Sequence, residues 1–380
     1  MTRSALALLA SLALITIPGC ADDEQTNRPT KPTSGTEGTG QVYGTEDTAR
    51  EVGSDHHIAL EGDHFAVGFG YAEELVGDAE NLYTVVRDKG ISTLVAIPRD
   101  GSRLRKIATG DFATSPLVLQ GTDLYVTRWL STGTVTYPAL YRVSTSGDVA
   151  QLTRYQNETF RIGGVVAGNR SVFFGGNEAI YEAPFDGGAY QVAARLDVAR
   201  PPLAMQDLPF TAFVADPDSF YAVRQDGVVA RVAKGSRTPE VLLSHDALTK
   251  HFDDHLLSSG TFVRTSIAQS ERFVSVLVTG KSLQDKDQDI TVVYRCSRGA
   301  AKCESLAKGS FSSVAIMDDD VWTVRAGSRE LTQIDASGTT NVKGVMPNQP
   351  SKLYVDPLKG AAYGIVSDGQ HWVIDVPATK

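Results

Sequence analysis

Short apolar runs separated by polar turns recur along this chain, and their spacing predicts its architecture. Seven times, a polar or small residue is followed by two mostly apolar ones, the second usually aromatic. The seven copies are Asn81-Leu82-Tyr83, Asp123-Leu124-Tyr125, Ser171-Val172-Phe173, Ser219-Phe220-Tyr221, Arg272-Phe273-Val274, Asp320-Val321-Trp322 and Ala361-Ala362-Tyr363. An apolar residue lies seven positions before the end of the first six copies (76, 118, 166, 214, 267, 315), and Val355 lies one place off in the seventh. Each unit therefore begins with an apolar strand, turns, and enters a second strand.

A second landmark falls later in six of the units. Glycines preceded by Asp, Ser, Lys or Arg occur at 101, 147, 187, 235, 299 and 338, and each has an aliphatic residue seven positions earlier. Such glycines favour tight hairpins, which adds a third and a fourth strand to the unit. Four antiparallel strands every 40 to 50 residues predict an all-β chain, a β-propeller of seven four-stranded blades. Six or eight blades are the competing counts.

The seventh unit lacks this hairpin, because the sequence ends at Lys380 soon after the apolar run at 372–376. One strand is therefore missing from the last blade, whereas an unassigned strand at 64–69 precedes the first. We expect residues 64–69 to pair beside 371–376 and close the ring, which also protects sheet edges that would otherwise be exposed.

The first twenty residues form an export signal. Arg3 supplies a positive charge, residues 5–17 are almost entirely apolar, and Ile17-Pro18-Gly19-Cys20 follows. This ending resembles a bacterial lipobox, and the resemblance implies that Cys20 carries lipid and becomes the N-terminus after cleavage. A cleaved signal without lipid is the alternative. Residues 1–19 are thus a predicted signal peptide, 20–56 a lipidated cysteine with a disordered tether poor in apolar residues, and 57–380 the propeller.

Charge and cysteine content exclude one class of partner and predict one covalent bond. The formal net charge is −9 and no Lys/Arg block is present, so nucleic acid is not an expected partner. With Cys20 assigned to lipid, only Cys296 and Cys303 remain, placed symmetrically about Gly299-Ala300. Opposite each other on a two-residue hairpin, they would lie within disulfide range. A structural disulfide is predicted.

Candidate metal ligands are few. Asp285, Asp287 and Asp289 alternate in the way that oxygen ligands of Ca²⁺ can, but the EF-hand template fails because Ile290 stands where Gly is required. Solvated loop carboxylates are the competing interpretation, so no metal or other cofactor is expected. Asp318-Asp319-Asp320 fits turn chemistry.

Histidines gather only at 245, 251 and 255, with Asp253 and Asp254 among them. His251 and His255 are four apart and would share one face of a helix, as zinc ligands can, although the HExxH motif is absent. A surface helix with incidental histidines is the simpler interpretation. Neither a GxSxG elbow nor a free thiol offers a nucleophile, and no catalytic residue is assigned. Arg128, Trp129, Tyr155 and Arg161 could line a binding face or be ordinary loop residues.

Residues 57–380 resemble bacterial propeller lipoproteins in their periodicity, without any family signature that would transfer a functional residue. The sequence favours a non-catalytic binding or scaffold module, held by lipid in the bacterial cell envelope, most simply at the outer membrane. Its partners would be the membrane and a protein or glycan on the propeller face. The alternative is a propeller enzyme, of hydrolase or lyase type, with its site in the central channel.

Overall fold

The computed structural model describes residues 64–100, 102, 104–131, 136–154, 164–176, 179–186, 189–199, 209–260, 263–285, 288–300, 302–317, 319–356, 358–367 and 371–377. The signal at 1–19, the lipidated Cys20 and the tether up to residue 56 lie outside these residues, so all three stay predictions. Among the described helices, none is long and apolar enough to cross a membrane.

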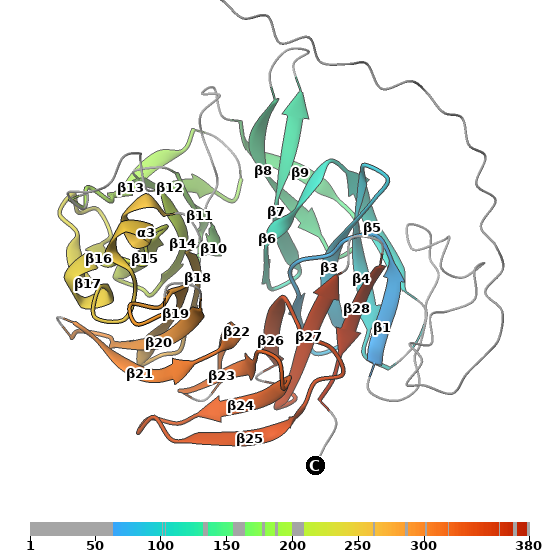
Figure 1. The fold of residues 1–380 in the computed structure, drawn as a ribbon. Coiled ribbons are helices and arrows are strands. Elements are labelled where there is room, and N and C mark those ends of the chain that lie inside the picture. The colour runs from blue at the N-terminus through green and yellow to red at the C-terminus, as the bar shows by residue number, and fades with distance from the viewer. Residues whose placement is uncertain are drawn as a thin grey trace, which may run out of the picture. The chain divides into compact units, whose positions relative to one another are not determined.

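Seven antiparallel sheets of four strands each build the propeller (Figure 1). Blades one and two are β2 (Val76–Gly77), β3 (Asn81–Asp88), β4 (Ile91–Pro98), β5 (Arg105–Gly110) and β6 (Phe112–Gln120), β7 (Asp123–Ser131), β8 (Thr136–Ser144), β9 (Val149–Arg154). Blades three and four are β10 (Val165–Ala167), β11 (Ser171–Gly175), β12 (Ala179–Pro184), β13 (Gln191–Arg195) and β14 (Phe210–Ala215), β15 (Ser219–Arg224), β16 (Val229–Ala233), β17 (Glu240–Leu243). Blades five and six are β18 (Arg264–Gln269), β19 (Phe273–Lys281), β20 (Asp289–Ser297), β21 (Cys303–Gly309) and β22 (Phe311–Met317), β23 (Asp320–Arg325), β24 (Glu330–Ile334), β25 (Thr340–Val345). Blade seven is β26 (Lys352–Asp356), β27 (Ala361–Ser367), β28 (His371–Asp375) and β1 (His64–Phe69).

The core lies between neighbouring blades. Both faces of a blade pack against another sheet, so the middle strands carry nearly continuous apolar runs, as in β3 and β4. Between blades one and two, for example, Tyr83 and Leu94 pack in one buried cluster with Val126 and Tyr141. The first strand of each blade contacts the first strand of the next, in the order β2, β6, β10, β14, β18, β22 and β26. These strands therefore lie nearest the axis of the propeller.

The repeating pattern predicts the strand pairing in most blades. In five of them the early apolar residue pairs directly opposite the last residue of the copy: Val76 with Tyr83, Val118 with Tyr125, Val166 with Phe173, Val214 with Tyr221 and Ala315 with Trp322. Blade five differs, because the turn from Ser270 to Phe273 places Ala268 opposite Ser275. Ile267, the residue seven positions before the end of that copy, therefore pairs with Val276 and not with Val274. All six predicted hairpins join third and fourth strands, with Gly147, Gly235, Gly299 and Gly338 at positive φ.

The ring closes as the sequence predicts. β1 pairs antiparallel with β28, with Val67 opposite Val373 and Phe69 opposite His371 (Figure 1). Blade seven then packs on blade one, where Leu82 shares a buried cluster with Ile374. The first and last described strands of the chain therefore belong to one sheet.

A small helical insertion stands between blades four and five. It consists of α2 (His245–Leu248) and α3 (Asp254–Ser259), and Asp253 caps α3 by accepting the amide of Leu256 at 3.1 Å. Leu248, Phe252 and Leu257 are fully buried in the cluster that joins the two blades. The insertion therefore fills the gap between the blades.

Candidate binding site

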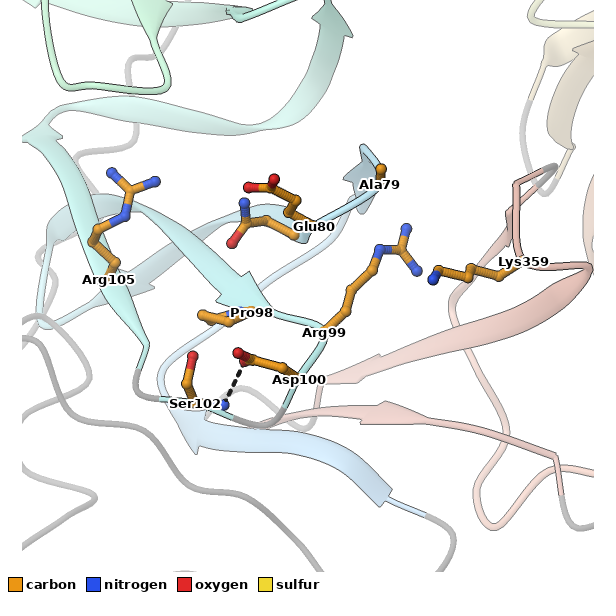
Figure 2. A pocket seen from close by; sticks show the side chains of 9 residues that line it. Ala79, Glu80, Pro98, Arg99, Asp100, Ser102, Arg105 and Lys359 are labelled. Carbon is orange, nitrogen blue, oxygen red and sulfur yellow. Dashed lines mark hydrogen bonds between the residues drawn. The ribbon is translucent and has the colours of Figure 1, made fainter.

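A polar cavity of about 560 Å³ opens at the seam between the first and last blades (Figure 2). Its walls come from the turn between β2 and β3, from the β4–β5 hairpin and from the turn between β26 and β27. The lining residues are Ala79, Glu80, Asn81, Pro98, Arg99, Asp100, Ser102, Arg105 and Lys359. Only Lys359 belongs to blade seven, so the cavity exists only because the ring is closed.

Arg99 fixes this seam. Its guanidinium lies 2.6 Å from the carboxylate of Asp356 in blade seven, and the two side chains are only 8% and 1% exposed. Nε donates to the carbonyl of Asp78 at 2.8 Å, Nη1 donates to the hydroxyl of Tyr363 at 3.2 Å, and the guanidinium lies over the Tyr363 ring. The buried pair as a whole is neutral. Arg99 therefore holds the cavity wall in place, and its positive charge is balanced by Asp356.

Two carboxylates hold the turns of blade one in place. Asp78 accepts the backbone amides of Glu80 and Asn81 at 2.8 and 2.7 Å, and its second oxygen accepts the Tyr83 hydroxyl at 2.6 Å. Burial acts to raise the pKa of Asp78, but these hydrogen bonds to the ionised form outweigh it and lower the pKa. Asp100 accepts the amide of Ser102 at 2.8 Å, the contact drawn in Figure 2. The cavity walls are therefore preset before any ligand arrives.

The accessible charged groups around the cavity are of both signs. Glu80, Arg105 and Lys359 are exposed, and Arg105 donates through Nη1 to the carbonyl of Thr145 at 2.8 Å. No hydrogen bond or ion pair joins the side chains of Glu80 and Lys359 to another described residue. Figure 2 shows Arg105 and Lys359 at opposite ends, with Glu80 and Asp100 between them. Basic and acidic groups thus surround one space.

The opposite end of the axis has a different character. In five blades, the first strand carries a hydroxyl three residues before a residue that pairs with the second strand. These are Ser115 before Val118, Thr211 before Val214, Thr265 before Ala268, Ser312 before Ala315 and Ser351 before Tyr354. Glu73 occupies the same position in blade one, and the corresponding residue of blade three is not described. Five of the six blades described at this position therefore carry a hydroxyl near this end of the propeller.

These hydroxyls connect blades to each other. Thr211 and Thr265 lie 2.9 Å apart across blades four and five, and Ser115 donates to Glu74 across blades two and one at 2.8 Å. Glu74 also faces the ammonium of Lys352 in blade seven, 3.4 Å away. Thr211, Ser312 and Ser351 also donate to backbone carbonyls of the second strand in their own blade. The hydroxyls therefore tie strands together both within blades and between them.

The acidic loop before β20 is only partly described. Asp289 forms an ion pair with Lys281 at 2.8 Å, and Asp287 lies outside the described residues. Across the part of the chain with described positions, no group of three or more His, Cys, Asp or Glu could hold a metal. Because Asp287 lies outside the described residues, Asp285, Asp287 and Asp289 stay untested as calcium candidates, as does the expectation that no metal binds.

The histidine cluster is a set of structural contacts. His245 Nε2 lies 2.7 Å from Asp254 and 3.3 Å from Ser258, and Nδ1 lies 3.6 Å from the buried Asp226. Ser258 is 1% exposed, so no substrate reaches this Ser-His-Asp arrangement. Asp226 in turn accepts two hydrogen bonds from Arg224, each 2.9 Å long. The network ties α3 to the β15–β16 hairpin.

The expected helical face of His251 and His255 was wrong. His251 precedes Asp253, the N-cap of α3, and its ring packs edge-on against Tyr294. Burial, together with Lys308 and Lys250, lowers the pKa of His251, whereas His255 is exposed on α3. The two histidines therefore share no site.

Of the four residues suggested for a binding face, only the side chain of Arg128 is described. Its guanidinium lies over the rings of Phe112 and Tyr141, at 5.8 and 5.6 Å from their centroids. It is thus packed within blade two. Trp129, Tyr155 and Arg161 have no described side chain and stay predictions.

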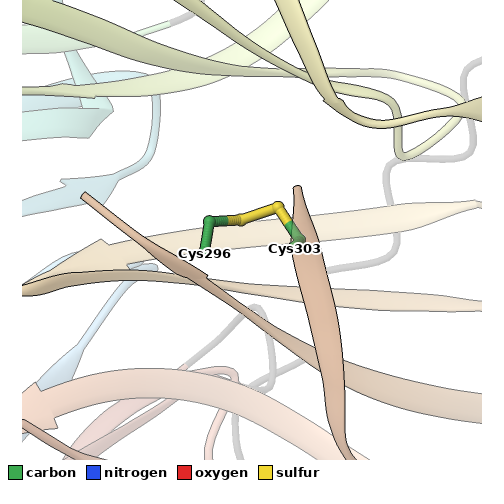
Figure 3. Close-up of a disulfide and its surroundings, with 2 residues drawn as sticks. All are labelled: Cys296 and Cys303. Atoms are coloured by element: carbon green, nitrogen blue, oxygen red, sulfur yellow. A yellow bond between two sulfur atoms is a disulfide. The ribbon is translucent and has the colours of Figure 1, made fainter. Parts of the chain in front are cut away.

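The predicted disulfide is formed. Cys296 and Cys303 pair directly opposite each other on β20 and β21, with their Cα atoms 4.1 Å apart (Figure 3). Cys296 is fully buried in the cluster between blades four and five. The bond joins the two strands of one hairpin close to its turn.

Similarity to solved structures supports the propeller. The structure of YCF48 bound to D1 peptide matches 85% of this chain and 98% of that chain at 13% identity, with a TM-score of 0.52. A structural genomics protein of unknown function from Bacteroides thetaiotaomicron VPI-5482 matches 87% of this chain and 74% of that chain at 11% identity, with a TM-score of 0.50. The WD40 β-propeller domain of Doa1 matches 81% and 97% at 11% identity, with a TM-score of 0.49. No protein-family model and no curated protein matches the sequence. At these identities the likeness extends to the fold alone.

Proposed function

We propose that this chain is a lipid-anchored protein of the bacterial cell envelope, held at the outer membrane, whose propeller is a non-catalytic binding module. The observation that carries the binding role is the preset polar cavity at the seam between blades one and seven. Exposed Glu80, Arg105 and Lys359 surround it, and buried Arg99 holds its wall in place. Rigid turns that present polar groups to a concave surface are typical of recognition sites.

The enzyme alternative receives no such support. An active site in the central channel would require acidic residues and histidines from several blades to converge on the axis. Five described first strands instead carry a hydroxyl near one end of the propeller, and in the Ser-His-Asp arrangement of the insertion the serine, Ser258, is buried.

Replacing Cys20→Ser should abolish palmitate labelling and move the protein from the membrane fraction to the soluble fraction. The reason is that a diacylglyceryl group supplies the two hydrocarbon chains that stable anchoring requires, and serine offers no sulfur to receive it. Metabolic labelling and fractionation of envelopes measure both effects. Membrane retention of the unlabelled variant would refute the lipid anchor.

A photoreactive amino acid placed at Ala79 in the cavity should give a covalent adduct with the partner in intact cells, whereas one at Asp88 should not. Ala79 lies in the turn before β3 and Asp88 is the last residue of β3, so they report on opposite ends of the propeller. Mass spectrometry of the adduct distinguishes a protein from a glycan partner. Equal adducts from both positions would contradict recognition at this end.

A further inference from the structure

The cavity at the seam presents acceptor-only and donor-only groups side by side. Ionised Glu80 and Asp100 can only accept hydrogen bonds, whereas Arg105 and Lys359 can only donate them. Ser102 and Asn81 supply groups that do both. A ligand that fills this space must therefore donate in some directions and accept in others, within a few ångströms.

Neither a simple anion nor a simple cation meets that demand. An anion between Arg105 and Lys359 would face Glu80 and Asp100, and a cation beside those carboxylates would face the two basic groups. The charge of Arg99 is not available to tip the balance, because Asp356 already pairs with it in the buried seam. Like-charge contacts in a preformed site weaken binding of either kind of ion.

A hydroxyl group both donates and accepts, so neighbouring hydroxyls can bond to the acidic and to the basic groups of the cavity. We infer that the cavity binds a neutral saccharide, with adjacent hydroxyls spanning from Glu80 and Asp100 to Arg105 and Lys359. This inference rests on the proposed binding function and names its ligand class. The volume of about 560 Å³ lies within the range of small-molecule sites and accommodates one or two sugar rings.

The walls of the cavity suit such a ligand because they do not have to be ordered on binding. Asp78 holds the turn that carries Glu80, and Asp100 holds the turn that carries Ser102. Pro98 fixes the strand end between them. A saccharide binds through many weak hydrogen bonds, so preorganisation of the protein side preserves most of their contribution.

The test is saturation-transfer NMR on the full mature chain in a detergent without a sugar headgroup. The probes are maltose, cellobiose and N,N′-diacetylchitobiose, with inorganic phosphate and putrescine as the anionic and cationic probes. At least one disaccharide should bind at millimolar concentration, and Glu80→Ala and Lys359→Met should each weaken its binding about fivefold, the effect of one lost hydrogen bond. Glu271→Ala, in the corresponding turn of blade five, and Lys343→Met, on β25, are exposed matched controls and should leave binding unchanged.

Three results would contradict saccharide binding. The first is that no disaccharide shows saturation transfer, and the second is that both cavity variants leave the transfer unchanged. The third is that only phosphate or putrescine binds. The photocrosslinking at Ala79 is independent of the probes. An adduct there with a protein, together with no disaccharide binding, would retain the binding module and reject its saccharide ligand. Loss of both would reject the binding function as well.

Discussion

A chain that begins at about Glu73 should be less stable than one that begins at about Asp55 by roughly 3–5 kcal/mol in free energy of unfolding, a loss at the upper end of ordinary effects. The shorter chain lacks β1, whose backbone pairs with β28 from His64 opposite Asp375 to Phe69 opposite His371. Without β1, the strand that contains buried Val373 and Ile374 becomes an exposed sheet edge. Urea unfolding followed by circular dichroism gives both free energies.

The longer chain is the matched control for this prediction. It removes the signal and most of the tether but keeps β1, so it should unfold in one cooperative transition at the midpoint of the full mature chain. Equal stability of the two truncated chains would show that β1 does not close the ring. The saccharide cavity gives a second readout, because Lys359 reaches it only when blade seven meets blade one.

Replacing Asp226→Asn should lower the free energy of unfolding by about 3–5 kcal/mol, because it leaves the charge of Arg224 buried without its counterion. The two side chains are 3% and 0% exposed and share two hydrogen bonds of 2.9 Å. His245 would also lose its contact with the Asp226 carboxylate, 3.6 Å away. Chemical denaturation of the purified variant measures the loss.

Two further variants make this prediction specific. Asp289→Asn breaks the more exposed ion pair with Lys281 and should change stability by less than about 1 kcal/mol. The double replacement Arg224→Met with Asp226→Leu removes both charges together and should be more stable than Asp226→Asn alone. A double variant as unstable as the single one would mean that the loss comes from packing and not from an unpaired charge.

The blade pattern was predictable because strand pairing repeats through the chain. A polar turn, an apolar pair and a glycine hairpin recur in the same order, so the sequence contains the register as well as the strand count. Blade five departs from the common register because Phe273 and Val274 form the apolar pair one position early. Only the backbone bonds of the turn from Ser270 to Phe273 reveal the true frame.

The cavity was not predictable for the opposite reason. Glu80 and Lys359 lie in turns, where polar residues are ordinary, and they stand 279 positions apart in sequence. Only closure of the ring brings them together. The shared helical face expected for His251 and His255 was wrong for another reason. The amide of Asp253 donates to the carbonyl of Lys281 at 3.1 Å, and α3 starts only after this residue, beyond His251. That contact depends on a strand that the local sequence does not contain.

The pairing of β1 with β28 also sets an order of events during synthesis. Phe69 and its partner His371 are separated by 302 residues, which a ribosome takes roughly 15–60 s to add at ~5–20 residues per second. Throughout that interval the first strand has been made and its partner has not. Contacts this distant in sequence also form slowly. The nascent chain therefore carries an unpaired strand for most of its synthesis, and its early segments need protection from aggregation until the last blade arrives.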